Sequence, residues 1–454
     1  MKRTNYRMVK ILELLSDIIS VTVGYWVLKA LFDITARPRL IYAGLLASTL
    51  FVLVVMDAYD DLYSYSTQRA RLPVTVGVSL AFTVAAFALF VLITGRSWAL
   101  PVMFYPVFFL ACGAMMLMGR SLVLRLAISA RKKRSMLILC HSGCPESFIT
   151  KLKRNSVDFG RVSVLRAGGA ADYEKILAAI DRSDNITLTA DIPADMRNRI
   201  IIYAYRNGKN IKLVPSVDTL FMLGGSVTHI GDTPVLRVKD GFFAPAELAV
   251  KRAFDFIAAL TGLVVLSPLF ALCAVGIKLD SPGGVFYRQE RYTINKKRFN
   301  IIKFRTMVAD AEKHGARLAT ENDERITRFG SIIRACRLDE LPQLINILRG
   351  EMSVVGPRPE RPVYADLYGD IVKNYDVRYI AKAGLTGYAQ VYGQYNTKVS
   401  DKVLFDSIYI NSFSLWLDIK LIAQTVMIMF IKESTEGVDE ALAKAPNDKA
   451  EEKS

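Results

Sequence analysis

Long apolar segments occupy most of the first 119 residues. One run reaches from about Ile11 to Phe32, and three more follow at Leu40–Met56, Pro73–Gly95 and Trp98–Met118. Each is close to the ~20 residues with which a helix crosses a bilayer. Because the four runs follow one another between charged flanks, they favour four membrane-spanning helices over residues 1–119 rather than a buried bundle in a soluble protein.

The charges around these runs indicate an orientation. Basic residues precede the first run and follow the fourth, namely Lys2, Arg3, Arg7, Lys10, Arg120, Arg125 and the cluster at 131–134. Because cytoplasmic flanks carry an excess of Lys and Arg, the N-terminus and everything after residue 119 are expected on the cytoplasmic side. Glu13 and Asp17 within the first run are expected near a helix end or against a partner helix.

Residues 135–240 alternate short apolar strands with amphipathic segments. Strands are predicted at 135–140, 161–166, 185–190 and 210–215, and helices at 146–154, 173–180 and 194–205. This alternation predicts a parallel α/β sheet of Rossmann type. The loop after the first strand, residues 141–145, lacks GxGxxG, so a structural or regulatory module is favoured over a dinucleotide site.

The apolar segment over residues 249–278 differs from the first four. Ser267-Pro268 lies in its middle, where proline removes a helical hydrogen bond and bends the helix. Both flanks are basic, with Lys251 and Arg252 before it and Lys278 after it. A re-entrant hairpin keeps both flanks on one side and is favoured, and a kinked fifth span is the alternative.

Residues 279–432 form a polar, charge-rich domain. Short strands are predicted at 285–287 and 299–304, a helix at 310–319, and a helical run at 332–348 that breaks at Pro342. The apolar stretch at 413–431 carries Asp418, Lys420 and Gln424, which favours an interfacial helix over a span. The charged, Ala-rich residues 437–454 are expected to be disordered.

Composition narrows the function classes. The 454-residue chain is 52% hydrophobic and carries a formal net charge of +16. It has no DNA-reading motif, so its excess positive charge is expected to serve an acidic membrane surface or a phosphorylated substrate, not nucleic acid. The five cysteines and three histidines show no zinc-binding spacing.

Two adjacent carboxylates, Asp339 and Glu340, stand among basic residues. Carboxylates beside cations are expected to keep low pKa values and stay ionised. An ionised Asp can act as a nucleophile, an ionised Glu can hold Mg²⁺, and arginines can grip phosphates. This pattern, followed by Pro357-Arg358-Pro359, predicts phosphoryl chemistry on an anionic substrate, with ordinary ion pairs on a helix face as the alternative.

Residues 249–431 resemble the bacterial sugar transferases, the polyisoprenyl-phosphate hexose-1-phosphate transferases. The resemblance rests on ordered motifs at 252–255 (RAFD), 266–269 (LSPL), 289–291 (QER), 303–307 (KFRTM), 323–327 (DERIT), 338–343 (LDELPQ), 350–359 (GEMSVVGPRP) and 384–387 (GLTG). The four spans and the Rossmann-like module resemble the large subgroup of the family. The chain departs from the family pattern at Thr293, where glycine is usual, and at Ala383, where proline is usual.

The resemblance implies a membrane protein of the α plus α/β class, with a monotopic α+β catalytic domain and a re-entrant helix, in the bacterial inner membrane with the catalytic domain facing the cytoplasm. It implies that Asp339 attacks a UDP-sugar and releases UMP, that Glu340 binds Mg²⁺, and that Arg334 and Arg358 contact phosphates. The acceptor would be undecaprenyl phosphate among the membrane lipids, at the start of exopolysaccharide, capsule or O-antigen synthesis. Homodimerisation also rests on the resemblance alone.

Other assignments have an equal structural alternative. Lys303, Arg305 and Arg291 are expected either in a phosphate pocket or in surface salt bridges, and Asp406 either in support of the metal or in a local pair. Two other functions stay open: a glycosyltransferase that releases UDP, and a non-catalytic membrane scaffold or sensor. The sequence leaves the donor sugar open.

Overall fold

The computed structural model describes residues 4–34, 38–56, 58, 65–94, 100–129, 134–141, 159–167, 172–230, 232–238, 245–308, 323–393 and 397–429. The chain divides into two compact units, Met1–Ser216 and Val217–Ser454. The predicted helices at 146–154 and 310–319 and the predicted disordered tail at 437–454 lie outside the described residues.

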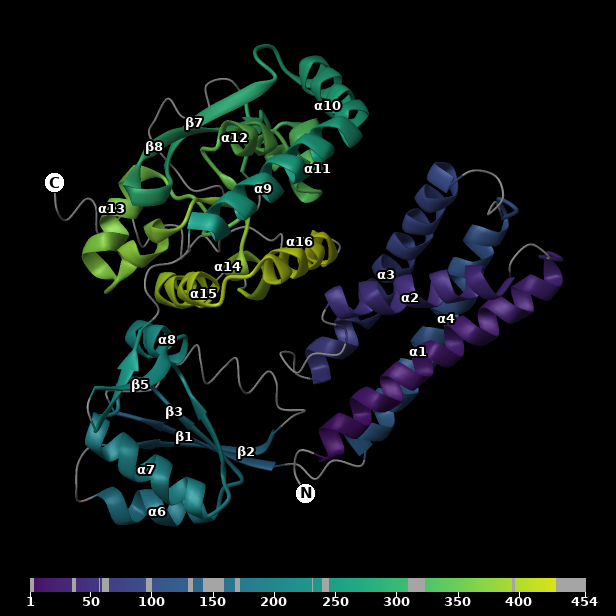
Figure 1. Cartoon of the computed structure of the whole chain (residues 1–454). Coiled ribbons are helices and arrows are strands. Elements are labelled where there is room, and N and C mark those ends of the chain that lie inside the picture. Colours follow the sequence, from purple (N-terminus) through teal and green to yellow (C-terminus); the bar gives the residue numbers. More distant parts are fainter. Residues whose placement is uncertain are drawn as a thin grey trace. The chain divides into compact units, whose positions relative to one another are not determined.

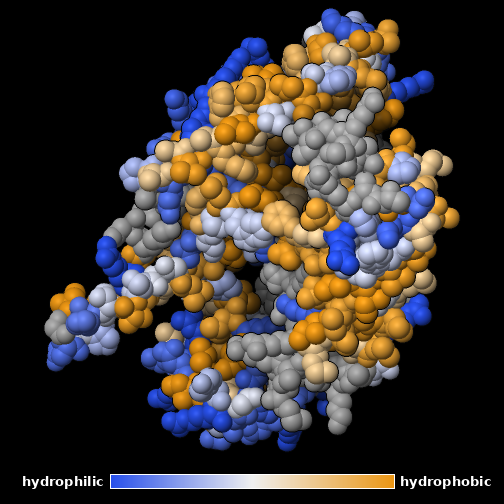
Figure 2. Space-filling view, turned by 45° about the vertical axis from the view of Figure 1, so that its right-hand side comes forward, coloured by the Kyte–Doolittle hydropathy of each residue, from blue (hydrophilic) through white to orange (hydrophobic). Residues whose placement is uncertain are grey.

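Four long apolar helices open the first unit: α1 (Thr4–Leu31), α2 (Pro38–Val55), α3 (Tyr65–Thr94) and α4 (Phe104–Ser129) (Figure 1). Each contains a segment long and apolar enough to cross a membrane, as the sequence predicts. Tyr25, Phe104 and Phe108 pack inside the bundle, while Val27 and Leu110 are exposed. Figure 2 shows the broad hydrophobic surface expected of a membrane protein.

A buried ion pair joins α1 to α4. Arg120 donates from Nε to Asp17 Oδ1 (2.9 Å) and from Nη2 to Asp17 Oδ2 (2.5 Å), and both side chains are at most 3% exposed. The sequence reading of Arg120 as a flanking charge beyond the fourth span was therefore wrong. Helix α4 continues to Ser129, and Arg120 stays inside the bundle because Asp17 neutralises it there.

A parallel sheet completes the first unit. It contains β1 (Arg134–Cys140), β2 (Phe159–Arg166), β3 (Asn185–Leu188) and β4 (Asn210–Leu213), with α6 (Tyr173–Asp181) and α7 (Ala194–Arg206) between strands. The predicted parallel α/β sheet is confirmed. Its strand order, β2-β1-β3-β4, follows the flavodoxin-like arrangement and not the 3-2-1-4 order of a dinucleotide-binding fold.

The second unit begins with α8 (Val217–Leu223) and the antiparallel hairpin β5 (Ser226–Ile230)–β6 (Thr233–Arg237). The sequence places these residues in the module at 135–240, whereas their contacts group them with the C-terminal part. One such contact is the 2.5 Å hydrogen bond from Asn411 Nδ2 to the Leu220 carbonyl. The Rossmann-like sheet itself therefore ends at Leu213.

A bent helix pair follows, α9 (Pro245–Val265) and α10 (Ser267–Asp280). The two axes differ by 62° at Leu266, which confirms the predicted bend at Ser267-Pro268. Ser267 Oγ donates to the Val264 carbonyl (2.8 Å), and Pro268 lies in the first turn of α10, where its missing N–H has no partner to lose within the helix. The geometry suits a broken span or a re-entrant loop, so the re-entrant path stays a prediction.

The remaining elements pack around one large hydrophobic cluster and two smaller ones. The strands are β7 (Phe286–Tyr292), β8 (Arg298–Phe304), β9 (Ser353–Val355) and β10 (Gly384–Thr386); the helices are α11 (Arg328–Ala335), α12 (Gln343–Arg349), α13 (Pro362–Ile371), α14 (Tyr388–Tyr392), α15 (Val399–Asn411) and α16 (Leu415–Met429), with 3-10 turns η3 (Ile294–Lys296), η4 (Leu338–Glu340) and η5 (Tyr375–Ile380). Ala259 of α9, Phe299 of β8 and Ile347 of α12 meet in the large cluster. Helix α9 is thus packed together with the strand β8 and the helix α12.

Candidate active site

The chain reverses direction just before the two carboxylates. Helix α11 ends at Ala335, and Arg337 takes a left-handed conformation (φ 53°, ψ 21°) that non-glycine residues seldom adopt. Asp339 and Glu340 then lie on the 3-10 turn η4, and Pro342 precedes α12. The helical break predicted at Pro342 therefore starts earlier, at Cys336–Arg337, and presents the carboxylates on a turn. The strained Arg337 is typical of a functional site.

Glu340 is held by two cations from different elements. Arg358 Nη2 donates to Glu340 Oε1 at 2.6 Å, and Arg358 Nη1 approaches Oε2 at 3.4 Å. Lys303 Nζ of β8 lies 3.2 Å from Oε1. The Glu340 side chain is 12% exposed, so solvent screens this pair less than a surface pair. The structure thus brings together three residues that the sequence predicted at the site.

Asp339 and Glu340 differ in proton affinity. Burial favours the protonated form of both, but Arg358 and Lys303 outweigh it at Glu340 and hold the pKa of Glu340 well below its usual range. Burial, followed by the Glu340 charge, raises the pKa of Asp339 to about 6. The expectation of a low pKa for both carboxylates was therefore wrong for Asp339, because its neighbour takes the direct ion pairs.

Asp339, unlike Glu340, has no direct partner for its carboxylate among the described residues. Within the described part of the chain, no group donates a hydrogen bond to its carboxylate or approaches it at ion-pair distance. Lys303, Arg334 and Arg358 still lower its pKa through space, which places all three cations around it. A carboxylate surrounded by positive charge without being tied to it can attack an electrophile that arrives with its own negative charge.

The Arg358 loop is anchored to the bent helix. Asp255 of α9 accepts from Ser353 Oγ (2.8 Å) and from the Val354 N–H (3.1 Å) at β9, four and five residues before Arg358. Lys251 Nζ bridges Asp255 (2.9 Å) and Asp418 of α16 (2.6 Å). Asp255 is part of the RAFD motif, but no function could be assigned to it from the sequence. Its role in the structure is to fix the helix against the strand that leads into the active-site loop.

Asp406 does not reach the carboxylate pair. Its Oδ2 lies 3.1 Å from Arg378 Nη2, and burial raises the pKa of Asp406 to about 6 although Arg378 opposes this. Arg378 Nη2 also donates to the Arg358 carbonyl (3.0 Å). Of the two alternatives for Asp406, the structure shows the local pair: Asp406 orients Arg378, a buried residue that no sequence motif indicated. Arg378 in turn holds the backbone of Arg358.

Arg291 and Arg305 are structural arginines. Arg291 donates to Gln289 Oε1 (2.6 Å) and to the Pro359 carbonyl (3.2 Å), so it fixes the residue after Arg358. Arg305 donates to the carbonyls of Ser281 and Pro282, both at 2.8 Å. The prediction of a phosphate pocket or a surface salt bridge is corrected for Arg305, because its buried guanidinium donates hydrogen bonds to backbone carbonyls.

The donor set suits a magnesium ion that arrives with its substrate. In the described residues, no three acidic, His or Cys side chains form a metal-binding cluster. Mg²⁺ in phosphate-transfer sites usually takes one or two carboxylates, with substrate phosphates and water as its other ligands. Glu340, kept ionised beside Asp339, fits that pattern. Mg²⁺ therefore stays a prediction, with Glu340 as its protein ligand.

Comparison with known proteins places residues 246–432 under the family model described as "Bacterial sugar transferase". A UDP-N-acetylgalactosamine-undecaprenyl-phosphate N-acetylgalactosaminephosphotransferase of Aeromonas hydrophila is 41% identical over 186 residues, which are 40% of this chain and 44% of that protein. A UDP-glucose:undecaprenyl-phosphate glucose-1-phosphate transferase of Xanthomonas campestris pv. campestris is 40% identical over 232 residues, 48% of this chain and 47% of that protein.

The match to a shorter relative extends over most of that protein's length. The UDP-glucose:undecaprenyl-phosphate glucose-1-phosphate transferase of Caulobacter vibrioides is 41% identical over 221 residues, 47% of this chain and 82% of that protein. The chain spans about half the length of the two longer relatives. The family match covers Asp339, Glu340, Lys303 and Arg358 together with the helix that anchors them. On this evidence the chain belongs to the bacterial sugar transferase family.

Proposed function

We propose that this protein transfers a sugar 1-phosphate from a UDP-sugar to undecaprenyl phosphate and releases UMP. The observation that carries the proposal is the division between the two carboxylates: Glu340 is paired with Arg358 and Lys303, while Asp339 is left uncommitted beside them. The names of the relatives specify UDP-sugars and undecaprenyl phosphate for those proteins.

The proposed reaction has two balanced steps. In the first, a carboxylate oxygen of Asp339 attacks the phosphorus that bears the sugar, and the bond from this phosphorus to the bridging oxygen breaks. UMP leaves with that oxygen and its electron pair. In the second, an oxygen of undecaprenyl phosphate attacks the same phosphorus, the bond to Asp339 breaks, and the carboxylate is regenerated. Covalent catalysis divides the transfer between a soluble donor and a lipid acceptor into two encounters.

The side chains around Asp339 supply charge and position more than proton transfer. Phosphoryl transfer depends mainly on stabilising the charge of the transferred group, and Arg358, Lys303 and Arg334 provide fixed positive charge near Asp339. With a pKa of about 6, Asp339 is mostly ionised at pH 7 and needs no base. Mg²⁺ held by Glu340, when bound, would neutralise the donor diphosphate.

The apolar helices suggest where the reaction occurs. The bent α9–α10 pair carries exposed Ile257, Val264 and Leu272, and α9 is locked to the Arg358 loop through Asp255. This supports a site at the level of the lipid phosphate. We propose the cytoplasmic face of a bacterial inner membrane, and a place at the start of polysaccharide synthesis, since one relative is named an exopolysaccharide production protein of Rhizobium leguminosarum bv. phaseoli.

The test is nucleotide release. Full-length protein in lipid nanodiscs, given Mg²⁺, undecaprenyl phosphate and a panel of UDP-glucose, UDP-galactose and UDP-N-acetylgalactosamine, should release UMP with one of the donors. Asp339→Asn should reduce turnover by at least about a thousandfold, because it removes the nucleophile. Asp370→Asn, an exposed carboxylate on α13, is the matched control and should retain activity.

Two outcomes would count against the proposal. Release of UDP in place of UMP would mean that sugar moves without its phosphate. Donor labelled in the sugar-side phosphate should also leave label on the wild-type protein, but not on Asp339→Asn, when the acceptor is omitted. Equal labelling of both proteins would reject Asp339 as the nucleophile.

A further inference from the structure

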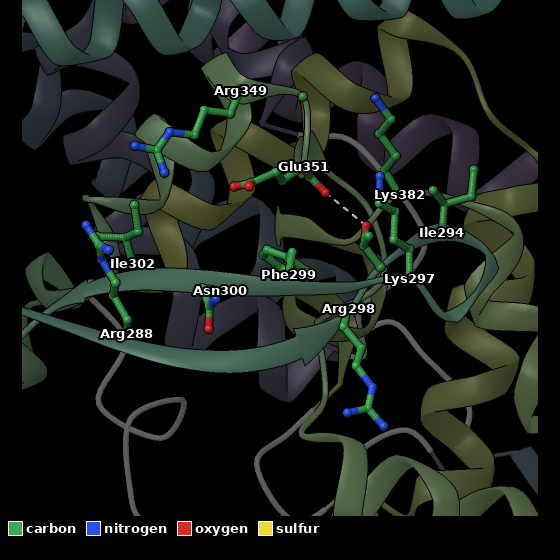
Figure 3. Close-up of a pocket in the computed structure, with 12 residues that line it drawn as sticks. Arg288, Ile294, Lys297, Arg298, Phe299, Asn300, Ile302, Arg349, Glu351 and Lys382 are labelled. Atoms are coloured by element: carbon green, nitrogen blue, oxygen red, sulfur yellow. Dashed lines mark hydrogen bonds between the residues drawn. The ribbon is translucent and has the colours of Figure 1, made fainter.

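A positively charged cavity lies beside the hairpin turn that joins β7 to β8 (Figure 3). Its volume is about 530 Å³. The walls come from the hairpin, from the end of α12 with the residues after it, and from the loop before β10. The lining residues are Arg288, Thr293, Ile294, Lys297, Arg298, Phe299, Asn300, Ile302, Arg349, Gly350, Glu351 and Lys382. None of the residues assigned above to the active site is among them.

The strand register separates this cavity from the active site. Tyr287 pairs with Lys303 across the hairpin, and the neighbouring pair is Arg288 with Ile302. Successive side chains of a strand point to opposite faces, so the face carrying Arg288 and Ile302 is opposite the face carrying Lys303. Lys303 contacts Glu340, whereas Arg288 and Ile302 line the cavity. Four of the five strand residues that line the cavity, Arg288, Arg298, Asn300 and Ile302, therefore lie on the face opposite Lys303, and only Phe299 shares the face of Lys303.

The cavity carries positive charge that the protein does not balance. Five cations and one carboxylate, Glu351, line it. Arg298 pairs with Glu290 at 3.4 Å on the solvent side. For the other four, Arg288, Lys297, Arg349 and Lys382, no carboxylate among the described residues lies within ion-pair distance. Burial and then the nearby Arg252 charge lower the pKa of Lys382, as expected where cations crowd together.

The walls of the cavity are fixed by hydrogen bonds. Thr293 Oγ1 donates to the Glu351 carbonyl (2.9 Å, the dashed line in Figure 3) and accepts from the Ala383 N–H (3.1 Å). The Asn346 side chain donates to Glu351 Oε2 (2.6 Å) and to the Asn300 carbonyl (2.8 Å). All three walls are thus joined to one another. The backbone segments that carry the cationic side chains are therefore already in place before an anion binds, so binding need not order them.

We propose that this cavity is a binding site for a phosphate-bearing anion, separate from the active site. Arg288 and Arg349 offer planar guanidinium groups that match phosphate oxygens in pairs. Lys297 and Lys382 add two ammonium groups at the rim, and Figure 3 shows Arg349 and Lys382 approaching from the side opposite the hairpin. The phosphate can belong to a soluble diphosphate or to an anionic lipid headgroup, which share this chemistry.

The test measures the reactivity of individual lysines in the full-length protein in nanodiscs. Lysine acetylation by an N-hydroxysuccinimide ester is quantified by mass spectrometry at Lys297 and Lys382, at Lys303 as a reporter of the active site, and at the exposed Lys373 as the reference. One arm adds inorganic pyrophosphate to phosphatidylcholine nanodiscs. The other compares these discs with discs containing roughly one third phosphatidylglycerol.

Protection of Lys297 and Lys382 relative to Lys373 in the pyrophosphate arm supports the proposal and identifies a soluble ligand. Protection in the phosphatidylglycerol arm supports it and identifies a lipid headgroup. No protection in either arm overturns it. Because Lys303 reports the active site separately and activity is not the readout, this result is independent of whether the proposed transferase reaction is correct.

Two variants test the role of the charges in opposite directions. Arg288→Gln/Arg349→Gln should raise the ligand concentration for half-protection at least about tenfold, because two charged hydrogen-bond donors are lost. Lys373→Gln/Lys398→Gln is the charge-matched control at exposed positions. This variant should leave the ligand concentration for half-protection of Lys297 and Lys382 unchanged, with Lys420 replacing Lys373 as the reference lysine. If the arginine variant fails to fold, Glu351→Gln decides, and half-protection should then need less ligand. Unchanged half-protection in the folded arginine variant, or in Glu351→Gln, would refute the assignment.

Discussion

At the scale of single residues, two adjacent carboxylates differ because their partners differ. Glu340 has the direct contacts with Arg358 and Lys303, and these keep it ionised. Asp339 receives the same cations only through space, together with the repulsion of Glu340. The outcome is one carboxylate that organises positive charge and one that can form a bond to phosphorus.

The raised pKa of Asp339 predicts an acid limb in the rate. The reactive form is the carboxylate, so UMP release measured as kcat/KM should fall about tenfold for each pH unit below about 6. Above pH 7 this limb should be flat, because Asp339 is already ionised. Initial rates of UMP release between about pH 4 and 8 provide the measurement. A rate that stays level down to pH 4 would mean that the pKa of Asp339 is not raised.

The raised pKa of Asp339 also predicts the stability of the Asp339→Asn variant. A carboxyl group whose pKa is higher in the folded than in the unfolded state binds protons more tightly when folded, so its contribution to stability is present at low pH and is lost as pH rises through about 6. Replacing Asp339 by neutral Asn removes that penalty at pH 7. The inactive Asp339→Asn protein should therefore unfold at a temperature no lower than the wild type.

At the scale of elements, the sequence predicted what depends on local pattern. Four apolar runs, the strand–helix alternation and the bend at Ser267-Pro268 all follow from neighbours along the chain. Contacts between distant residues were not predictable in this way. Arg305 looks like a phosphate ligand until its carbonyl partners at 281–282 are seen, and Arg120 looks like a flanking charge until Asp17, far away in sequence, is found beside it.

The two residues that depart from the family pattern, Thr293 and Ala383, contact each other in the structure. Thr293, in place of the usual glycine, accepts a hydrogen bond from the Ala383 N–H, which the usual proline would lack. Thr293→Val should lower the free energy of unfolding by about 1–3 kcal/mol, because it leaves the buried N–H without a partner, whereas Thr293→Ser should retain most of the stability.

A double-mutant cycle tests this coupling. Ala383→Pro should cost less in the Thr293→Val background than in the wild type, because the hydrogen bond is already absent there, with a coupling of at least about 0.5 kcal/mol. Thermal or denaturant unfolding of the four proteins provides the measurement. Strictly additive effects would show that the hydroxyl and the N–H do not depend on each other.

The ion pair between α1 and α4 makes a second prediction at this scale. Arg120→Leu alone removes the guanidinium that is bound to the buried Asp17 carboxylate, and should destabilise the helix bundle by about 3–5 kcal/mol. Asp17→Leu/Arg120→Leu should recover much of this loss, because no uncompensated charge remains. Unfolding in detergent provides the measurement, and the exposed Arg125→Gln on the same helix is the control. A double variant as unstable as the single one would contradict this account.

At the scale of the whole molecule, the proposed chemistry belongs to the second unit alone. Every residue assigned to the active site lies within Val217–Ser454. The Caulobacter relative matches this chain over 221 residues that make up 82% of its own length, so a protein of that family can consist mostly of this part. The residues assigned to the active site, the bent helix pair and the family match all lie in this unit, whereas the four long helices and the parallel sheet belong to the first unit.

We predict that residues 217–454, expressed alone and reconstituted in nanodiscs, release UMP with a kcat within about tenfold of the full-length protein, since this unit contains every residue assigned to the active site. The Asp339→Asn form of the fragment provides the background rate. A folded fragment without activity would show that the first unit contributes directly to the reaction centre.

The Asp17–Arg120 pair also has a consequence for biosynthesis. Its two members are 103 positions apart, so the ribosome completes α1 well before it makes the partner on α4. At roughly 5–20 residues per second, the carboxylate waits about 5–20 seconds for its counter-charge. We infer that insertion of α1 into lipid is completed only after α4 has been made, because a charged side chain is costly in the hydrocarbon core.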